Sequence, residues 1–360
     1  MNNPNYIPKK SIEENMNIPQ GYKQTEFGPI PSDWGVCTFQ NVLTTFSSGA
    51  TPYRGIPEYY KGNVRWISSG ELNYNKIFDT IEHISQQAVR NTNLRVHQSG
   101  TFLMAITGLE AEGTRGRCAF VGAPATTNQS CLAINGTERM CTEYLFWFYR
   151  QWSDFLAFNF SQGSKQQSFT AEIVKRLPLY APKYKEQEKI AEALSDVDKL
   201  IRELDTLIEK KRAVMQGTMQ ELLTAHRRLP GFVHPWRNTL VEKCCKITTG
   251  ESNTRDQIES GIYPFYIRSA TVMRSNSYIF DCEGVITIGD GQIGKVFHYV
   301  NGKFDLHQRC YLMYDFDDID VKFFYFLFSF FFYHIGKLFV RVPWFACGLW
   351  IEGDMNIASS

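Results

Sequence analysis

The stretch Gly289–Lys295, Gly-Asp-Gly-Gln-Ile-Gly-Lys, comes nearest to a motif with known chemistry. It almost matches the P-loop, in which a glycine-rich turn and a lysine hold phosphate groups. The P-loop requires Ser or Thr after the lysine, because that hydroxyl binds magnesium, and it leads into a helix. Here Val296 follows, and the residues after it favour a strand. The sequence therefore argues against nucleotide binding.

No other group of residues indicates catalysis. The chain has no HExxH, no GxSxG and no Asn-Pro-Pro-aromatic signature of the amino-methyltransferases. The acidic pairs Glu110/Glu112 and Asp317/Asp318 lie in polar stretches, where solvated carboxylates are the simpler interpretation. Seven histidines are scattered without the spacing of a metal site. This pattern favours a binding module over an enzyme.

Polar loops beside aromatic-rich strands carry the side chains that could bind DNA. Arg, Lys, Gln, Ser and Thr donate hydrogen bonds to phosphates and to the edges of bases. The candidate DNA contacts are Ser48, Gly49, Thr51, Arg54, Thr107, Arg115, Arg117, Lys165, Gln166, Gln167, Thr249, Arg255, Gln292 and Lys295. Each residue alone is equally well explained as an ordinary surface residue, so the prediction concerns the loops as sets.

Short strands and a few helices must position these loops. In the first half, runs of β-forming residues predict strands at 63–67, 100–108, 117–121 and 131–134, and an aromatic-rich helix is predicted over 143–158. This mixture predicts an α+β domain built on an irregular sheet or barrel.

The second half repeats the landmarks of the first half in the same order. Pro235-Trp236 corresponds to Trp34, 284–289 to 100–108, and His307-Gln-Arg-Cys310 to Asn128-Gln-Ser-Cys131. A Phe-rich helix after Asp320 corresponds to the helix after Glu143. The order indicates a duplicated domain. After Lys337 the correspondence stops, so the second domain is expected to be incomplete.

One long helix is predicted between the two halves, from Lys185 to about Ala225. Its apolar residues are spaced alternately by four and three positions, as in a coiled coil. Within the predicted helix, no Pro or Gly occurs before Gly217. An ordinary amphipathic helix packed on its own domain is the alternative. The expected seam consists of Ile190, Leu194, Val197, Ile201, Leu204, Ile208, Met215 and Leu222.

The length and composition predict a water-soluble protein of two or three domains. The 360 residues have a net charge of +1, and 43% are hydrophobic. Nine cysteines without CxxC pairs, and no signal peptide, predict reduced thiols in a cytoplasmic protein. The Phe-rich run 323–333 is too short to span a membrane and is expected to be a buried helix.

The chain resembles the specificity (S) subunit of type I restriction-modification systems. The resemblance rests on 21–34, ending in Pro-Ser-Asp-Trp34, on Gly49-Ala-Thr-Pro52 and Arg65-Trp-Ile67, and on Gly163-Ser-Lys-Gln-Gln167. It continues in 177–190, which leads into the long helix, and covers roughly residues 21–340. The order of these motifs is more specific than any one of them.

The resemblance implies two target-recognition domains that read the halves of a bipartite site in double-stranded DNA. It also implies spacer helices that dock methyltransferase (M) subunits, and a restriction/motor (R) subunit. The S subunit would catalyse nothing and bind no cofactor directly, while its partners would use S-adenosylmethionine, ATP and magnesium. The expected layout is a disordered start (1–20), a first recognition domain (21–184), the spacer helix (185–228), a partial second domain (229–342) and a tail foreign to the family (343–360).

The family pattern predicts a second spacer helix near the end of the chain, and this sequence has no heptad pattern there. The chain therefore resembles a C-terminally truncated S subunit. One hypothesis is a homodimer in which the seam pairs with the same helix of a second chain, and which reads a palindromic bipartite site. A truncated, inactive product and a coiled-coil scaffold that does not read DNA are the alternatives.

Overall fold

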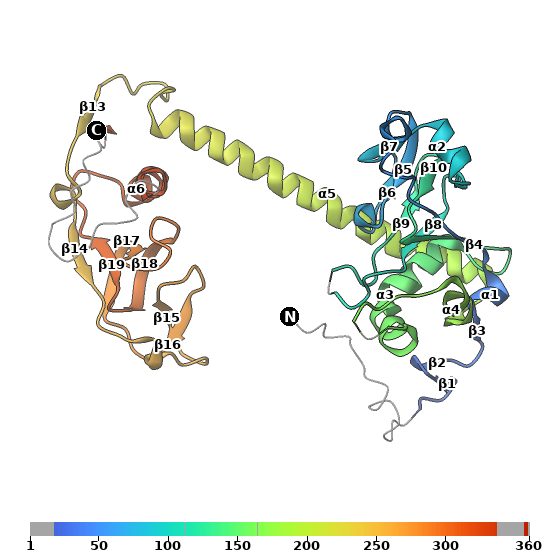
Figure 1. The fold of residues 1–360 in the computed structure, drawn as a ribbon. Helices are drawn as coiled ribbons and strands as arrows, with labels where there is room; N and C mark the ends of the chain where they lie inside the picture. The colour runs from blue at the N-terminus through green and yellow to red at the C-terminus, as the bar shows by residue number, and fades with distance from the viewer. Residues whose placement is uncertain (1–17, 112, 164, 337–355, 359–360) are drawn as a thin grey trace. The chain divides into compact units, whose positions relative to one another are not determined.

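A computed structural model describes residues 18–111, 113–163, 165–336 and 356–358. The chain divides into two compact units, 1–204 (unit 1) and 205–360 (unit 2), which are considered separately. Both combine open sheets with helices, which confirms the predicted α+β class (Figure 1). In the part that the structure describes, no sheet closes into a barrel.

Unit 1 is built on a five-stranded sheet with the strand order β4-β11-β8-β9-β6. Its strands are β4 (Thr44–Ser48), β6 (Lys76–Ile77), β8 (Phe102–Ala105), β9 (Cys118–Val121) and β11 (Cys131–Asn135). A three-stranded sheet has the order β10-β5-β7, from β5 (Val64–Ile67), β7 (Glu82–Ile84) and β10 (Ala125–Thr127). All four strands predicted in this half are therefore present.

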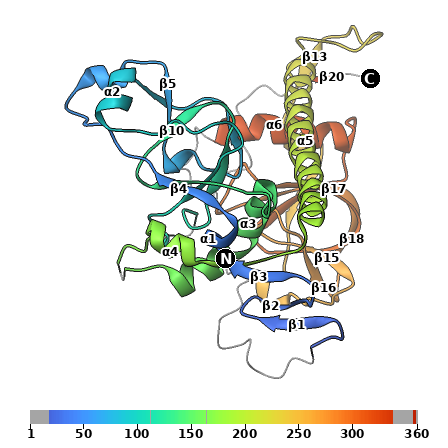
Figure 2. The same ribbon diagram turned by 90° about the vertical axis from the view of Figure 1, so that its right-hand side faces the viewer.

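Two small antiparallel pairs complete the strands of unit 1. The hairpin of β1 (Tyr22–Thr25) and β2 (Gly28–Pro31) is drawn in blue in Figure 2, and β3 (Gly35–Thr38) pairs with β12 (Pro178–Ala181). The shorter helices are α1 (Phe39–Val42), α2 (Gln86–Asn91), α4 (Ala171–Arg176) and the 3₁₀ turns Pro57–Tyr60 and Ser69–Glu71. The side chain of Thr170 accepts a hydrogen bond from Ile173 N at the start of α4, and Pro178 follows its end.

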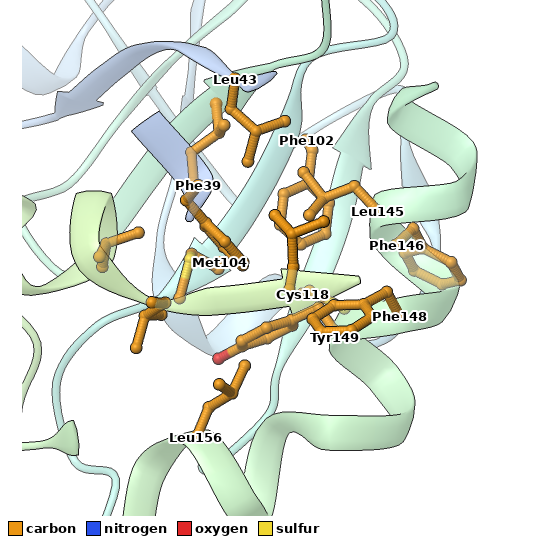
Figure 3. Packing of buried hydrophobic residues seen from close by; sticks show 14 of the residues in the cluster. Phe39, Leu43, Phe102, Met104, Cys118, Leu145, Phe146, Phe148, Tyr149 and Leu156 are labelled. Atoms are coloured by element: carbon orange, nitrogen blue, oxygen red, sulfur yellow. The ribbon is translucent and has the colours of Figure 1, made fainter. Parts of the chain in front are cut away.

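Helix α3 (Thr142–Phe160) contributes more buried residues to the main core of unit 1 than any other helix or strand. Its inner face turns Leu145, Tyr149 and Leu156 toward Phe102 and Met104 of β8, and all five side chains are fully buried (Figure 3). Burying one such side chain contributes about 1.5–3 kcal/mol. The core therefore holds β8 and its neighbouring strands rigidly, and with them the loops at the strand ends.

Helix α5 (Tyr184–Leu223) is the predicted long helix, and it begins on unit 1. Gln187 is 1% exposed and fixes the first turn through three hydrogen bonds. Its Oε1 accepts from Cys141 N, and its Nε2 donates to Arg139 O and Pro182 O, each at 2.9 Å. About three turns further along α5, Asp198 accepts from Arg150 of α3 at 3.0 Å. The start of α5 is thus tied to the start of α3.

Unit 2 contains a six-stranded sheet with the order β14-β19-β17-β18-β15-β16. The strands are β14 (Lys246–Thr249), β15 (Tyr263–Tyr266), β16 (Met273–Ser275), β17 (Phe280–Ile288), β18 (Phe297–Leu306) and β19 (Cys310–Tyr314). Two 3₁₀ turns lie at Val241–Lys243 and Thr254–Asp256. Helix α6 (Val321–Gly336) buries Phe324, Leu327 and Phe328 against this sheet, as expected for the Phe-rich run. None of the described helices is long and apolar enough to cross a membrane.

The strand pairings of unit 2 follow those of unit 1. The antiparallel pair β14–β19 corresponds to β4–β11, and the parallel pair β15–β18 corresponds to β5–β10. A further strand, β20 (Asn356–Ala358), pairs with β13 (Trp236–Asn238) as β12 pairs with β3. The sequence analysis did not predict this last pairing, because it treated residues 343–360 as a tail with no counterpart in the first domain. The sequence analysis expected the second domain to lack a loop and a second long helix after Lys337. Most of the positions concerned lie outside the described residues.

Candidate nucleic-acid interface

Four loops of unit 1 come together at one end of its five-stranded sheet. Ser48, the last residue of β4, pairs with Leu132, while Cys131, the first residue of β11, pairs with Ala105 at the end of β8. The loops beyond these strand ends must therefore leave the sheet on the same side. We name this surface the unit 1 edge, and it consists of residues 48–54, 106–111, 113–117, 128–130, 162–163 and 165–168.

The fourth loop joins the edge through backbone bridges rather than through a strand. Ser168 bridges both Thr107 and Gln162, and Leu109 N donates to Gln167 O at 3.1 Å. Gln167 N in turn donates to Glu110 Oε2 at 2.8 Å. Two loops predicted as separate DNA-binding sets, 107–117 and 164–167, are thus one surface.

Gly49 has a steric role at this edge. A Cβ atom on Gly49 would lie 1.8 Å from Thr127 O, so only glycine allows β10 to approach so closely. The next residue, Ala50, donates its N–H to Thr127 O at 3.1 Å and accepts a bond from Trp66 Nε1 at 3.0 Å. The Gly-Ala-Thr-Pro and Arg-Trp-Ile segments therefore join the five-stranded and the three-stranded sheets of unit 1.

The three arginines of unit 1 that were predicted to contact DNA already have partners within unit 1. Arg54 makes a two-bond ion pair with Glu82 at 2.6 and 2.7 Å, and these bonds hold the pKa of Glu82 below its ordinary value. Arg115 donates to Asp154 at 2.6 Å, and its side chain is only 13% exposed. Arg117 donates to the carbonyl oxygens of Gly113 and Gly70.

The side chains most available to a ligand at the unit 1 edge are therefore uncharged or belong to Lys165. Ser48, Thr51, Lys165 and Gln166 are exposed, whereas Thr107 and Gln167 are half-buried. Arg115 stabilises the loop through its ion pair and its contact with the Phe158 ring at 4.3 Å. A glutamine that the sequence analysis did not select, Gln129, is also exposed at this edge.

Unit 2 has a corresponding edge where β14, β17 and β19 end. Thr249 pairs with Tyr311, and Ile288 pairs with Cys310, so the loops 250–256, 289–296 and 307–309 leave the sheet together. We name these residues the unit 2 edge. The four residues predicted here, Thr249, Arg255, Gln292 and Lys295, are all exposed.

Asp290 ties two arginines together at the unit 2 edge. It accepts from Arg268 at 2.9 and 3.0 Å and from Arg309 at 2.8 Å. Partial burial raises the pKa of Asp290, but the two arginines outweigh it and the pKa lies below its usual value. The sequence analysis missed Arg268 and Arg309, since an ion pair between residues about twenty positions apart leaves no local pattern.

The glycine-rich segment 289–295 is part of this edge. A strand was predicted after Lys295, and β18 confirms it. The glycines also have the GxGxxG spacing of dinucleotide-binding turns, which likewise need a helix to follow. The segment therefore lacks the helix N-terminus on which both phosphate-binding motifs depend. Among the described residues, no cluster of three potential metal ligands occurs.

The seam of α5 is exposed along most of its length. Leu194, Val197, Ile201, Leu204, Ile208 and Met215 have between 42% and 56% of their surface accessible. Ile190, at the start, packs on the core of unit 1. A second apolar row that the sequence analysis did not note, Leu200, Leu207 and Val214, runs beside the seam and is equally exposed. Such a broad apolar face on a charged helix is typical of a partner-binding surface.

Comparisons with known proteins agree with these features. A family model described as "Type I restriction modification DNA specificity domain" matches residues 31–211. The type I restriction enzyme MjaIX specificity subunit of Methanocaldococcus jannaschii is 31% identical over 185 residues, which are 50% of this chain and 41% of that protein. The putative type I restriction enzyme MjaX specificity subunit of the same organism is 25% identical over 213 residues, 57% of this chain and 49% of that protein.

A solved structure supports the fold. The S subunit of a type I restriction-modification system from M. genitalium superposes with a TM-score of 0.59 at 14% identity, over 85% of this chain and 80% of that chain. The alignments span less than half the length of the two M. jannaschii relatives. Because the family model covers half of the chain, including the unit 1 edge and most of α5, the chain belongs to the type I restriction-modification DNA specificity domain family.

Proposed function

We propose that this chain is a specificity subunit that reads a bipartite DNA site for a type I restriction-modification complex. The observation that carries the proposal is the unit 1 edge, where four loops rich in hydrogen-bond donors and acceptors meet on a rigid sheet. A surface of this kind can read base edges, whereas its arginines are held by internal partners. Recognition rather than catalysis is its proposed task, and the chemistry would belong to methyltransferase and motor subunits.

Methylation mapping tests this proposal. The chain is expressed with the methyltransferase subunit of a type I system from the same genome, and the DNA is sequenced for modified adenines. A bipartite motif that depends on this chain is the expected result. A soluble chain that binds the methyltransferase subunit but directs no modification would contradict the proposal. A coiled-coil scaffold would give this second result.

We also propose that α5 pairs with the α5 of a second copy in antiparallel orientation. In a parallel pair, equivalent seam positions face each other, so Lys211 would meet Lys211 of the partner. In the antiparallel pair, Ile190 faces Leu222 of the partner, Val197 faces Met215 and Leu204 faces Ile208. Lys211 then meets Ile201, along which its aliphatic stem can pack. The seam is more complementary to itself in this orientation.

The surface beside the start of the seam offers room for a partner. Ile190 and Leu194 line a hollow of about 470 Å³ together with aromatic residues of α3, including Trp147 and Trp152. In the antiparallel alignment, the end of the partner's α5 lies opposite this point. An apolar side chain there would be covered by aromatic rings, and this favours pairing over a free helix.

Light scattering at micromolar concentration measures the pairing. A chain of 41.5 kDa is expected to scatter as a particle of twice that mass. Leu204→Glu with Ile208→Glu places charges in the seam and should give the monomer mass. Ala213→Glu adds charge on the opposite face of the same helix and should leave the dimer intact. A monomer for the unchanged chain would refute the pairing without touching the DNA-reading proposal.

A further inference from the structure

The turn Asn128–Cys131 holds one glutamine at the tip of the unit 1 edge. Asn128 closes the turn, because Ser130 N donates to its Oδ1 at 3.1 Å and Cys131 N donates to its carbonyl oxygen at 3.2 Å. Bonds to two neighbouring strand ends fix the turn: Asn128 N donates to Ile67 O, and Ile106 N donates to Ser130 O, both at 2.9 Å. Gln129 is the exposed residue of this turn.

Unit 2 builds the same turn with different side chains. His307 takes the place of Asn128: Arg309 N donates to its Nδ1 at 3.1 Å, and Cys310 N donates to its carbonyl oxygen at 2.9 Å. The outer anchors also recur, since His307 N donates to Tyr266 O at 3.0 Å and Gly289 N donates to Arg309 O at 2.9 Å. Gln308 and Arg309 are the exposed residues of this turn, and Arg309 is held by Asp290.

The two turns have four hydrogen bonds in common although their closing residues differ. Each also lies against a glycine that tolerates no side chain: a Cβ on Gly49 would meet Thr127 O at 1.8 Å, and one on Gly250 would meet Leu306 O at 2.0 Å. The common product of this architecture is an exposed glutamine amide between the same loops of each edge. Packing requires no glutamine at either position, because both side chains are exposed.

We propose that Gln129 and Gln308 each specify one adenine–thymine base pair, one in each half of the DNA site. A glutamine amide presents an acceptor and a donor in one plane, and these match N6–H and N7 of adenine in the major groove. The inference rests on the proposed function, since it assigns a base-reading group to the surface that is proposed to read DNA.

Thr51 acts as a positioning residue for Gln129. The Thr51 hydroxyl donates to Gln129 Oε1, and this bond fixes which way round the amide group lies. Oε1 keeps a second lone pair for a base, and Nε2 remains as the donor. In unit 2, Ser252 lies beside the turn and its carbonyl oxygen accepts from Gln308 N, but its hydroxyl donates to Asp305 at 2.6 Å. The amide of Gln308 is therefore held less firmly, and its discrimination should be the weaker of the two.

Methylation mapping of four variants tests the assignment. Gln129→Ala should relax one position of one half-site, lowering the preference for A·T there by about tenfold to a hundredfold, and Gln308→Ala should relax one position of the other half. Gln129→Glu should move the preference toward cytosine, because a carboxylate accepts from N4–H of cytosine. Gln87→Ala, on the exposed surface of α2, is the matched control and should leave the motif unchanged.

A second pair of variants tests the positioning role. Thr51→Val removes the hydroxyl and should relax the same base position as Gln129→Ala, though by less. Thr51→Ser keeps a hydroxyl and should retain the base preference of the unchanged chain. If the unchanged chain directs a motif and the glutamine variants leave every position intact, the assignment is wrong and the proposed function survives. If the unchanged chain directs no modification while bound to the methyltransferase subunit, both fail. Circular dichroism of each variant establishes that the fold is retained.

Discussion

Replacing Gln187 with leucine should weaken the attachment of α5 to unit 1. The substitution keeps the side-chain size but removes one acceptor and two donors, and it leaves Cys141 N, Arg139 O and Pro182 O without these partners. Each buried polar group left unpaired costs about 1–3 kcal/mol. The apolar leucine atoms recover about 1–2 kcal/mol by their own burial. Three such groups cost about 3–9 kcal/mol, so the expected net loss in the free energy of unfolding is about 1–8 kcal/mol.

Urea unfolding of the full chain, followed by tryptophan fluorescence, measures this loss. Hydrogen exchange in peptides covering 139–147 and 184–192 shows whether the loss is located where α3 and α5 begin. Gln216→Leu makes the same exchange on the exposed surface of α5, and its effect should stay within about 0.5 kcal/mol. A loss below about 1 kcal/mol for Gln187→Leu, or faster exchange spread evenly over unit 1, would show that Gln187 does not anchor the helix.

Three further changes have effects that follow from single features of the structure. Gly217→Ala lies in the interior of α5 with open space where the Cβ would stand, so it should stabilise the chain by about 0.5–1 kcal/mol in the same urea assay. Gly49→Ala should cost several times that amount because its Cβ would collide with Thr127 O, whereas Gly70→Ala, whose Cβ meets nothing nearer than 3.8 Å, should cost little. Burial, with Arg95 nearby, lowers the pKa of His97 to about 4. Between about pH 4 and the ordinary histidine pKa of about 6.5, the unfolded chain binds a proton that the native chain does not. The free energy of unfolding should therefore decrease as the pH is lowered through this range, by up to about 1.4 kcal/mol per pH unit. The pH dependence should flatten in His97→Gln, and an unchanged dependence would contradict the burial argument.

Elements with a strong local pattern could be predicted from the sequence. The helix expected from Lys185 to about Ala225 is α5 (Tyr184–Leu223), because its apolar period extends over many turns. The helix expected over 143–158 is α3 (Thr142–Phe160), and the strands at 63–67 and 131–134 lie within a residue of β5 and β11. The duplicated order of landmarks also agrees with the matching strand pairings of the two units.

The candidate site was harder to predict because it depends on contacts between distant segments. Arg54 looked available for DNA, but its carboxylate partner Glu82 lies 28 residues away and no local pattern reveals the pair. Gln129 was overlooked for the converse reason: it stood inside a landmark that served only to align the two halves. Its exposure at the tip of a fixed turn depends on bonds to β5 and to the end of β8, which only the folded chain brings together.

The similarity of the two turns decides which kind of DNA site the proposal expects. If only unit 1 read DNA, a dimer would present the same reader twice, and the methylated motif would be a palindrome. Unit 2, however, builds its turn with the same hydrogen bonds and exposes Gln308 at the tip. Its surroundings differ, since Arg309 stands where unit 1 has Ser130 and is tied to Asp290. Two readers with one architecture and different side chains favour two different half-sites. An asymmetric motif is therefore expected if the two units of one chain read the two half-sites. A palindromic motif would show instead that equivalent units of the two paired chains read the site.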